Sequence, residues 1–174
     1  DLHDLDGFFT QVEAAAAVQR VPAGAMVSEY GAGQFEINLH HVDDALAACD
    51  QAILLRRLIR GVARQQGLAA TFMAKPFRDL DGSGMHVHFS LLDRAGRNVF
   101  APAPPATTPE AWPETLRHAV GGMLAAIPES LAIFAPNANS YRRFRPGFFV
   151  PIARSEEHTS ELQSLTNLVI RLLL

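Results

Sequence analysis

The chain has 174 residues, 48% of them hydrophobic and 19% charged, which is the composition of an ordinary globular chain with room for one core. Its formal net charge of -3 excludes a broadly basic surface, so no nucleic-acid or membrane-surface partner is expected and a small molecule is the expected ligand. The sequence predicts no signal peptide and no membrane span, and its single cysteine, Cys49, is compatible with a reducing cytoplasm.

The first predicted elements are a helix and two strands. Apolar residues at three- to four-residue spacing indicate an amphipathic helix over residues 4–19. Residues 25–30 and 34–40 indicate strands that are separated by a glycine-rich turn. The second strand alternates strictly, so its apolar side chains share one face and its polar side chains share the other. Its polar positions are Gln34, Glu36 and Asn38.

A long helix and two more strands follow. Asp43 or Asp44 caps the helix, and Gly67 ends it. Residues 69–75 and 85–92 indicate strands, and the second of these has a period of two. The polar side chains that share one face of it are those of His86, His88 and Ser90.

The last predicted elements are helices. After a surface loop at residues 101–109, the sequence predicts helices over 112–127 and 129–134, with a break at Pro128. No internal repeat is present. The elements together predict an α+β fold, in which an antiparallel sheet presents a polar catalytic face and carries helices on its other face.

Carboxylates and imidazoles on the two polar faces suit a divalent metal. Glu29 and Glu36 would supply hard oxygen ligands of the kind that Mg²⁺ and Mn²⁺ prefer, and His86 an imidazole that Mn²⁺ tolerates better. Zinc would prefer more nitrogen or sulfur ligands. The same spacing also fits a solvated Glu36 and a hydrogen-bonded core histidine, so spacing alone leaves both interpretations open.

Two further features suit an anion. The turn Gly82-Ser83-Gly84 can offer free backbone amides to a ligand, or can simply connect two segments tightly. Arg142 and Arg143 can clamp a carboxylate or phosphate, or can form a solvated basic patch. The residues alone leave these alternatives open.

Four segments, in one order along the chain, resemble the successive signatures of the glutamine synthetase family. They are Glu29-Tyr-Gly-Ala-Gly-Gln-Phe-Glu36, Ala70-Thr-Phe-Met-Ala-Lys-Pro76, Gly82-Ser-Gly-Met-His-Val-His88 and Asn139-Ser-Tyr-Arg-Arg143. The resemblance covers roughly residues 1–153 and implies part of the family's catalytic domain. It also implies a ligase that transfers the γ-phosphoryl group of ATP to the side-chain carboxylate of glutamate, after which ammonia or an amine displaces phosphate.

The resemblance implies roles for the metal-binding candidates. By motif position, Glu29 and Glu36 resemble ligands of the metal nearer glutamate and ammonium. His86 resembles a ligand of the metal nearer the ATP phosphates. The implied ions are Mg²⁺ or Mn²⁺, two of which would offset the repulsion between a polyphosphate and a carboxylate nucleophile.

Substrate-binding roles are implied in the same way. His88 and Ser90 resemble nucleotide-contacting positions, Gly82 lies in the glutamate-binding loop, and Arg143 resembles the arginine that grips the substrate's carboxylate. Ammonia-using members usually carry Asn where this chain has Asp81, which replaces an amide by an acceptor only. The resemblance therefore leaves the amine acceptor open.

Other departures point toward a larger amine. Residues 148–151, Phe-Phe-Val-Pro, replace the Tyr-Glu-Ala-Pro of many ammonia-specific enzymes. Residues 33–39, Gly-Gln-Phe-Glu-Ile-Asn-Leu, look more like the γ-glutamylpolyamine or γ-glutamylamide synthetase branch. Removing a polar residue near the amine pocket would favour a bulkier amine.

Several family parts have no counterpart in the chain. These are the N-terminal β-grasp domain, the paired Glu-x-Glu metal ligands and the later Arg-x-Glu-x-Arg segment. We therefore expect the polypeptide alone to be inactive and its parent to be a cytoplasmic, ring-type homo-oligomer. Two alternatives are a metal-dependent hydrolase that uses the same histidines and glutamates, and a catalytically inactive homologue.

The last residues form a separate unit in this interpretation. Residues 154–164, Arg-Ser-Glu-Glu-His-Thr-Ser-Glu-Leu-Gln-Ser, look like the in-frame translation of a common sequencing adapter. We therefore divide the chain into a partial catalytic domain at residues 1–153 and a non-native tail at residues 154–174. The alternative is a genuine amphipathic helix, capped by Ser155 and carrying a leucine-rich stripe.

Overall fold

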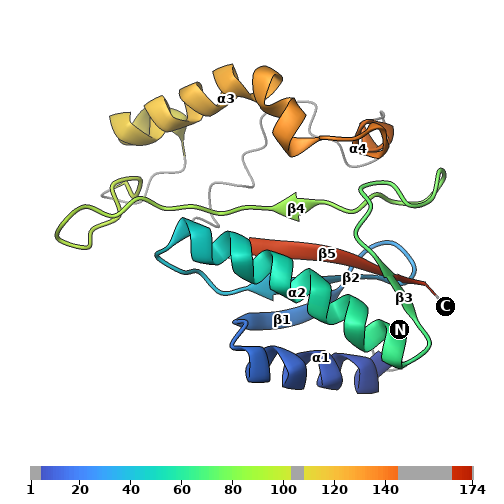
Figure 1. Ribbon diagram of the computed structural model, residues 1–174. Coiled ribbons are helices and arrows are strands. Elements are labelled where there is room, and N and C mark those ends of the chain that lie inside the picture. Colours follow the sequence, from blue (N-terminus) through green and yellow to red (C-terminus); the bar gives the residue numbers. More distant parts are fainter. Residues whose placement is uncertain (1–4, 103–107, 145–165, 174) are drawn as a thin grey trace.

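The computed structural model describes residues 5–102, 108–144 and the backbone of 166–173 (Figure 1). It combines helices with one antiparallel sheet, which confirms the predicted α+β class. The helices are α1 (Asp6–Gln19), α2 (Ala45–Gln65), the 3-10 turn η2 (Pro109–Ala111), α3 (Glu114–Phe134) and α4 (Ala138–Arg143). The strands are β1 (Ala23–Ser28), β2 (Gln34–Leu39), β3 (Ala69–Thr71), β4 (Met85–His86) and β5 (Thr166–Leu173).

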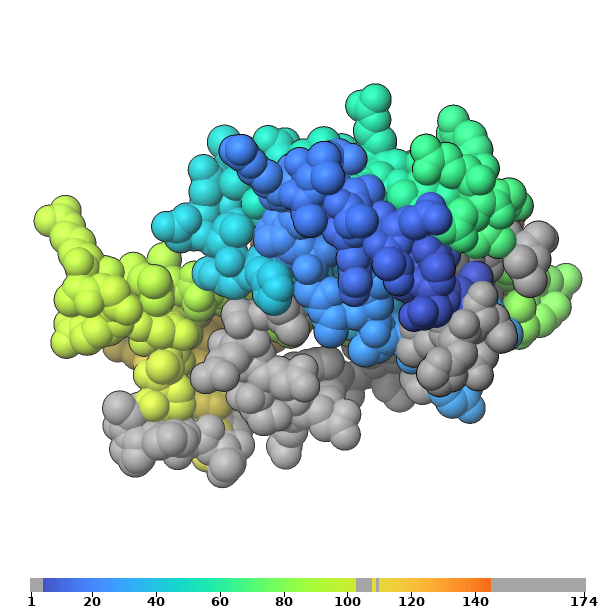
Figure 2. Space-filling view, turned by 90° about the horizontal axis from the view of Figure 1, so that it is seen from below, coloured from blue at the N-terminus to red at the C-terminus, as the bar shows by residue number. Residues whose placement is uncertain are grey.

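The sheet has the order β1-β2-β5-β3, and β4 also pairs with β5. Every pairing is antiparallel. Helices α1 and α2 lie together and pack on β2, whereas α3 and α4 lie beyond β4, above the sheet in Figure 1. Seen from the side of α1, the blue residues of α1 occupy the middle of the surface, beside the cyan and green residues of α2 (Figure 2).

The core lies between β2 and the helix pair. The apolar face that strict alternation predicts for β2 is buried here, with Phe35 at 2% and Ile37 at 0% exposure. The Phe35 ring meets the ring of Phe9 from α1 edge to face, with centroids 5.0 Å apart. Helix α2 contributes Leu55 and Ile59, which are both fully buried. Burial of each such side chain contributes roughly 1.5–3 kcal/mol, so this layer fixes where β2 lies.

Asp44, rather than Asp43, caps α2. Its carboxylate accepts hydrogen bonds from the backbone N–H groups of Leu46 at 2.8 Å and Ala47 at 3.1 Å. These bonds satisfy two amides that the first helical turn leaves without partners. At the other end of the helix, Gly67 has a φ of 74°, a left-handed conformation that glycine adopts without strain.

We expect Asp44→Ala to lower the free energy of unfolding by about 1 kcal/mol, because both capping bonds are lost. Asp43→Ala is the matched control, since it removes the same charge from the preceding residue without removing a cap. Urea titrations followed by circular dichroism would measure both variants. Equal midpoints for the two would contradict the assignment of the cap to Asp44.

Two predicted strands are much shorter than expected. The strand predicted over 69–75 ends at Thr71, and the one predicted over 85–92 pairs only at Met85 and His86. The backbone carbonyl of Ala74 instead accepts a hydrogen bond from the N–H of Ser83 at 2.9 Å. This loop contact occupies the Ala74 carbonyl, which would bond to a neighbouring strand if the predicted strand continued.

The predicted break at Pro128 is wrong, because α3 continues through it. Proline removes one N–H, but its fixed φ is helical and the other bonds of the 21-residue helix remain. Leu116 is the only buried residue of α3, so most of this apolar helix is uncovered. The described part of the chain nevertheless holds no helix with the length and hydropathy needed to cross a membrane.

The helical alternative for the tail is wrong over residues 166–173, which form the strand β5. β-branched Thr166, Val169 and Ile170 favour a strand, and β5 pairs with β2 on one side and with β3 and β4 on the other. Residues 154–165 lie outside the described residues. That residues 154–174 are non-native stays a prediction, which sequencing of the genomic locus across Ala153 would test.

Candidate active site

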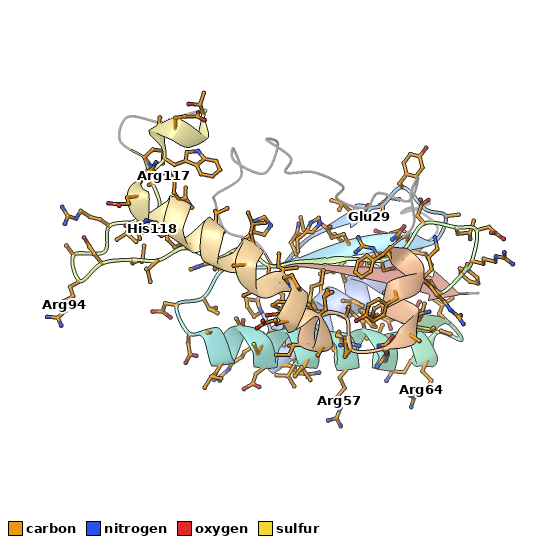
Figure 3. The ribbon with its side chains drawn as sticks, turned by 90° about the horizontal axis from the view of Figure 1, so that it is seen from above. Glu29, Arg57, Arg64, Arg94, Arg117 and His118 are labelled. Carbon is orange, nitrogen blue, oxygen red and sulfur yellow. The ribbon has the colours of Figure 1, made fainter. Side chains whose placement is uncertain are left out.

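The two glutamates proposed as metal ligands share one face of the sheet. Val27 lies opposite Glu36, and beyond the end of β1 the Glu29 N–H donates to the carbonyl of Gln34 at 2.9 Å. Glu29 and Glu36 are therefore diagonal neighbours on adjacent strands, about 7–8 Å apart at the backbone and within reach of each other's side chains. Glu29 is half-buried and lies at the open end of β1 (Figure 3), and Glu36 is 8% exposed.

Burial of this polar face differs from the expectation. The sequence predicts a polar catalytic surface, but the side chains of β2 on that face are all buried, with Gln34 at 3%, Glu36 at 8% and Asn38 at 9% exposure. The Asn38 Oδ1 has no hydrogen-bond partner among the described residues. Buried polar groups usually have partners, so this face has the character of a site interior rather than of a solvated sheet surface.

Gln34 joins the β1–β2 turn to the glycine-rich turn. Its side-chain amide donates to the Gly82 carbonyl at 2.9 Å and lies 3.5 Å from the Ser83 hydroxyl. Its Oε1 accepts from the Gly31 N–H at 3.3 Å. Strand alternation predicts that Gln34 lies on the polar face, but it predicts no role for its amide. One amide thus brings together two segments that lie 48 residues apart.

Arg143 lies directly against the glycine-rich turn. A Cβ atom on Gly82 would lie 2.7 Å from the Ala74 carbonyl oxygen and 2.9 Å from the Arg143 Cγ. A Cβ on Gly84 would lie 3.0 Å from the Arg143 Nη2. Glycine is therefore required at Gly82 for the arginine side chain to lie along the turn, and the structure brings together two of the predicted substrate-binding residues.

The charge of Arg143 has no partner among the described residues, where it forms neither an ion pair nor a hydrogen bond. Burial lowers the pKa of its guanidinium from the ordinary value, but an arginine stays protonated at neutral pH. A half-buried cation without an anion is costly, so this group suits a carboxylate or phosphate ligand.

Arg142 does not join Arg143 at the turn. It lines a separate cavity of about 310 Å³ together with Lys75, Pro76 and Arg78. Consecutive residues near the end of a short helix project in different directions, so the two arginines cannot grip one small anion as a pair. Of the two interpretations of the arginine pair, a clamp remains for Arg143 alone.

A reciprocal amide contact holds α4 against the loop that precedes the turn. The Lys75 N–H donates to the Asn139 Oδ1 at 2.8 Å, and the Asn139 Nδ2 donates to the Lys75 carbonyl at 2.8 Å. The Lys75 ammonium donates to the Leu80 carbonyl. Asn139 and Lys75 thus position Arg143. The sequence signal was present in the two motifs that contain them, although no role was assigned.

His86 lies on the same side of the sheet as the glutamates. It is opposite Asn167 of β5, which is itself opposite Asn38 of β2. Two strand spacings, about 10 Å, separate His86 from that strand. Glu36 and His86 therefore suit two neighbouring ions better than one.

The donor set for a metal is only partial. The carboxylates of Glu29 and Glu36 have the chemistry that Mg²⁺ or Mn²⁺ requires. Within residues 5–102 and 108–144, however, no group of three or more histidine, cysteine, aspartate or glutamate side chains gathers closely enough to hold an ion. Glu29, Glu36 and His86 can therefore supply some of the ligands of two hard cations, but they do not complete the ligand shell of either ion.

His88 and Ser90, the predicted nucleotide contacts, line a cavity of about 570 Å³. Leu39 and the successive residues His40 and His41 line its other side, followed by residues at the start of α2. A cavity of this size, with a largely apolar wall and a few polar groups, is typical of small-molecule sites. No motif in the sequence predicts a role for His40 or His41, although both follow directly after β2.

The chain belongs to the glutamine synthetase family. The family described as "Glutamine synthetase, catalytic domain" matches residues 2–155. The gamma-glutamylputrescine synthetase PuuA of Escherichia coli (strain K12) is 41% identical over 165 residues, which are 95% of this chain and 34% of that protein. A glutamate–isopropylamine ligase of a Pseudomonas species is 47% identical over 116 residues, which are 67% of this chain and 24% of that protein.

A solved structure gives the same result. The structure titled "GmaS/ADP complex-Conformation 1" superposes with a TM-score of 0.72 at 28% identity, and the match covers 88% of this chain and 34% of that one. The family prediction made from four motifs is therefore confirmed. The chain spans about a third or less of the length of these relatives.

Proposed function

We propose that this chain is part of an ATP-dependent ligase that joins the γ-carboxylate of glutamate to an amine through a γ-glutamyl phosphate. The observation that carries the proposal is Arg143, a half-buried guanidinium without an anionic partner among the described residues, held on the turn at Gly82. The named activities of the relatives, gamma-glutamylputrescine synthetase and glutamate–isopropylamine ligase, support it.

Each part of the site has a distinct task in this proposal. Arg143 binds the carboxylate of glutamate through its planar donors, and the backbone at Gly82 passes close to the substrate because it has no side chain. Glu29 and Glu36 would hold one Mg²⁺ or Mn²⁺ ion, and His86 a second. When bound, such ions neutralise negative charge on the phosphates and on the attacking carboxylate.

The cavity beside His88 and Ser90 is where we propose that the nucleotide binds. Its imidazole and hydroxyl groups can donate to or accept from a base or ribose, while the apolar wall excludes water. The related GmaS structure is titled as an ADP complex, which is consistent with a nucleotide in this family. Catalysis in such a site rests on positioning two anions in line.

We propose that the acceptor is an alkylamine or polyamine rather than ammonia. Asp81 is half-buried next to the turn at Gly82, and its carboxylate can only accept hydrogen bonds. A second cationic end of a diamine would pair with such a group. Relatives named for putrescine and isopropylamine favour the same choice.

The test is an acceptor comparison on the full-length protein that carries this segment. Glutamate and ATP are supplied with putrescine, isopropylamine or ammonium, and phosphate release is measured. We expect at least one amine to exceed ammonium in kcat/KM by about tenfold, the selectivity that about 1.4 kcal/mol of binding provides. A preference for ammonium would assign the protein to glutamine synthesis, and no dependence on any acceptor would refute a ligase.

The isolated chain should release no phosphate under the same conditions. Only part of each proposed metal shell lies within the described residues, so the charges of ATP and glutamate would not be neutralised together. ATP-dependent formation of a γ-glutamyl product by the isolated chain would contradict this. For the parent protein we propose a ring-type homo-oligomer in the cytoplasm, and size-exclusion chromatography with light scattering tests the assembly.

A further inference from the structure

The outer face of α2 carries a row of four exposed arginines. They are Arg56, Arg57, Arg60 and Arg64. Residues three, four and seven positions apart lie on one side of a helix, so the four guanidinium groups follow a single face. Arg57 and Arg64 project outward from α2, away from β2 and β5 (Figure 3). Within the described part of the chain, no carboxylate forms an ion pair with any of the four.

Two of these arginines lie over the ring of one phenylalanine. The Cζ atoms of Arg56 and Arg60 each lie 5.2 Å from the centroid of the Phe72 ring. Phe72 packs against the hydrophobic core and follows directly after β3, so the ring is a fixed support. Like charges four residues apart on a helix repel each other, whereas the face of an aromatic ring attracts both. The ring therefore restrains two guanidinium groups, and an anion that contacts both would relieve their repulsion.

The arginine row borders a shallow hollow of about 460 Å³. Gly61 lies within its lining, and a Cβ atom on Gly61 would have no other atom within 4 Å. The floor of the hollow is therefore open between the arginines. Because α2 covers the apolar face of the sheet, this surface lies on the opposite side from the polar face of β2 that carries Glu36.

We propose that this arginine face binds an oligophosphate, meaning two or more linked phosphoryl groups, either free or as the tail of a nucleotide. A single carboxylate would neutralise one of four positive charges, whereas linked phosphoryl groups carry several negative charges and can contact several of the arginines at once. Guanidinium groups grip phosphate oxygens bidentately, and Arg56 and Arg60 are already oriented by Phe72. The face is thus a second anion site, separate from the candidate active site.

Isothermal titration of the 174-residue chain with tripolyphosphate at about 0.15 M salt tests the proposal, because charges more than about 8 Å from the ligand are then largely screened. Arg56→Gln/Arg60→Gln should weaken binding by about tenfold or more, because charge-assisted contacts from two guanidinium groups are lost. The matched control is Arg94→Gln/Arg117→Gln, which removes the same charge from exposed positions distant from α2 (Figure 3). The control variant should keep its affinity within about twofold, since distant exposed charges are screened.

A second variant separates the contribution of the Phe72 ring from that of the arginine charges. Phe72→Leu keeps all four arginines and an apolar side chain, and it should still weaken tripolyphosphate binding several-fold, about the worth of a cation–π contact. Far-UV circular dichroism verifies the fold of each variant. Titrations with ADP distinguish the sources: equal affinity for ADP and tripolyphosphate indicates the phosphates alone. Tighter ADP binding that is weakened in Arg56→Gln/Arg60→Gln indicates a nucleotide on this face rather than in the cavity beside His88 and Ser90.

The site would be refuted by either of two results. One is wild-type affinity in Arg56→Gln/Arg60→Gln, which would place the anion elsewhere, including at Arg143 and the candidate active site. The other is no detectable heat at millimolar tripolyphosphate. Neither result bears on the proposed ligase, which rests on residues of the opposite side of the sheet.

Discussion

Replacing Arg143 by lysine in the full-length protein should lower kcat/KM for glutamate by about tenfold to 100-fold, because one of two charge-assisted hydrogen bonds, worth about 1.5–3 kcal/mol, is lost. Lysine keeps the positive charge but is a point donor, so it cannot grip a carboxylate with two parallel bonds. Its ammonium also lacks the planar shape that lies along the turn at Gly84, 3.0 Å from where a Cβ atom would stand.

Arg142→Lys is the matched control for this substitution. The two arginines are adjacent, but Arg142 lines the separate cavity with Lys75 and Arg78. We expect its kcat/KM to stay within about threefold of wild type, since an exposed substitution away from the site costs little. The measurement is phosphate release at varied glutamate with saturating ATP and amine. An equal loss of kcat/KM in the two variants would contradict the proposal that Arg143 binds the carboxylate of glutamate.

The split between kcat and KM adds information. If Arg143 binds glutamate equally well in the ground state and the transition state, the loss falls on KM with kcat unchanged. If its grip tightens as the acyl phosphate forms, kcat falls as well. A gain of binding by Arg143→Lys would contradict both forms of the proposal.

The first half of the fold follows closely from the sequence. The helix predicted over 4–19 is observed as Asp6–Gln19, and the strand predicted over 34–40 as Gln34–Leu39. Both segments bury one face in the same core, so their periodicity and their environment agree. The alternation of β2 also predicts that Glu36 lies on the other face of the strand from Phe35 and Ile37. This separation defines the polar face.

Strand lengths beyond Gly67 could not be predicted in the same way. Residues 85–92 have a strand-like period, yet Val87, Phe89 and Leu91 are all more than half exposed, so no core selects a continued strand. Strand formation depends on a partner, and the partner here is β5, 80 or more residues further along the chain. A periodic pattern without a surface to bury does not determine structure.

The site was predictable in its residue types but not in its connections. The glutamates, His86 and the arginine followed from motif positions, whereas the bonds from Gln34 to Gly82 and from Asn139 to Lys75 cross 48 and 64 residues of sequence. Long-range amide contacts leave no periodic signal. The different directions taken by Arg142 and Arg143 depend on where α4 begins, and no periodic pattern predicts this short helix.

The largest expected effect on stability comes from Phe35→Ala, which should lower the free energy of unfolding of the chain by about 3–5 kcal/mol. Phe35 is 2% exposed and packs edge to face on Phe9, so its removal leaves a cavity between β2 and α1 that the neighbouring backbone cannot easily fill. A small domain has only about 5–15 kcal/mol of stability in total, so this single change approaches complete unfolding.

Phe134→Ala is the matched control, because the same ring is removed at the end of α3 where Phe134 is 74% exposed. Its unfolding free energy should change by no more than about 0.5 kcal/mol. Urea titrations followed by far-UV circular dichroism would measure both variants, and similar midpoints would show that β2 is not held by its apolar face.

Since Glu36 is the next residue and Gln34 the preceding one, a displaced β2 would also separate Glu29 from Glu36 and release the turn at Gly82. Loss of the core should therefore abolish ligand binding at Arg143 even though no group that touches the ligand has changed.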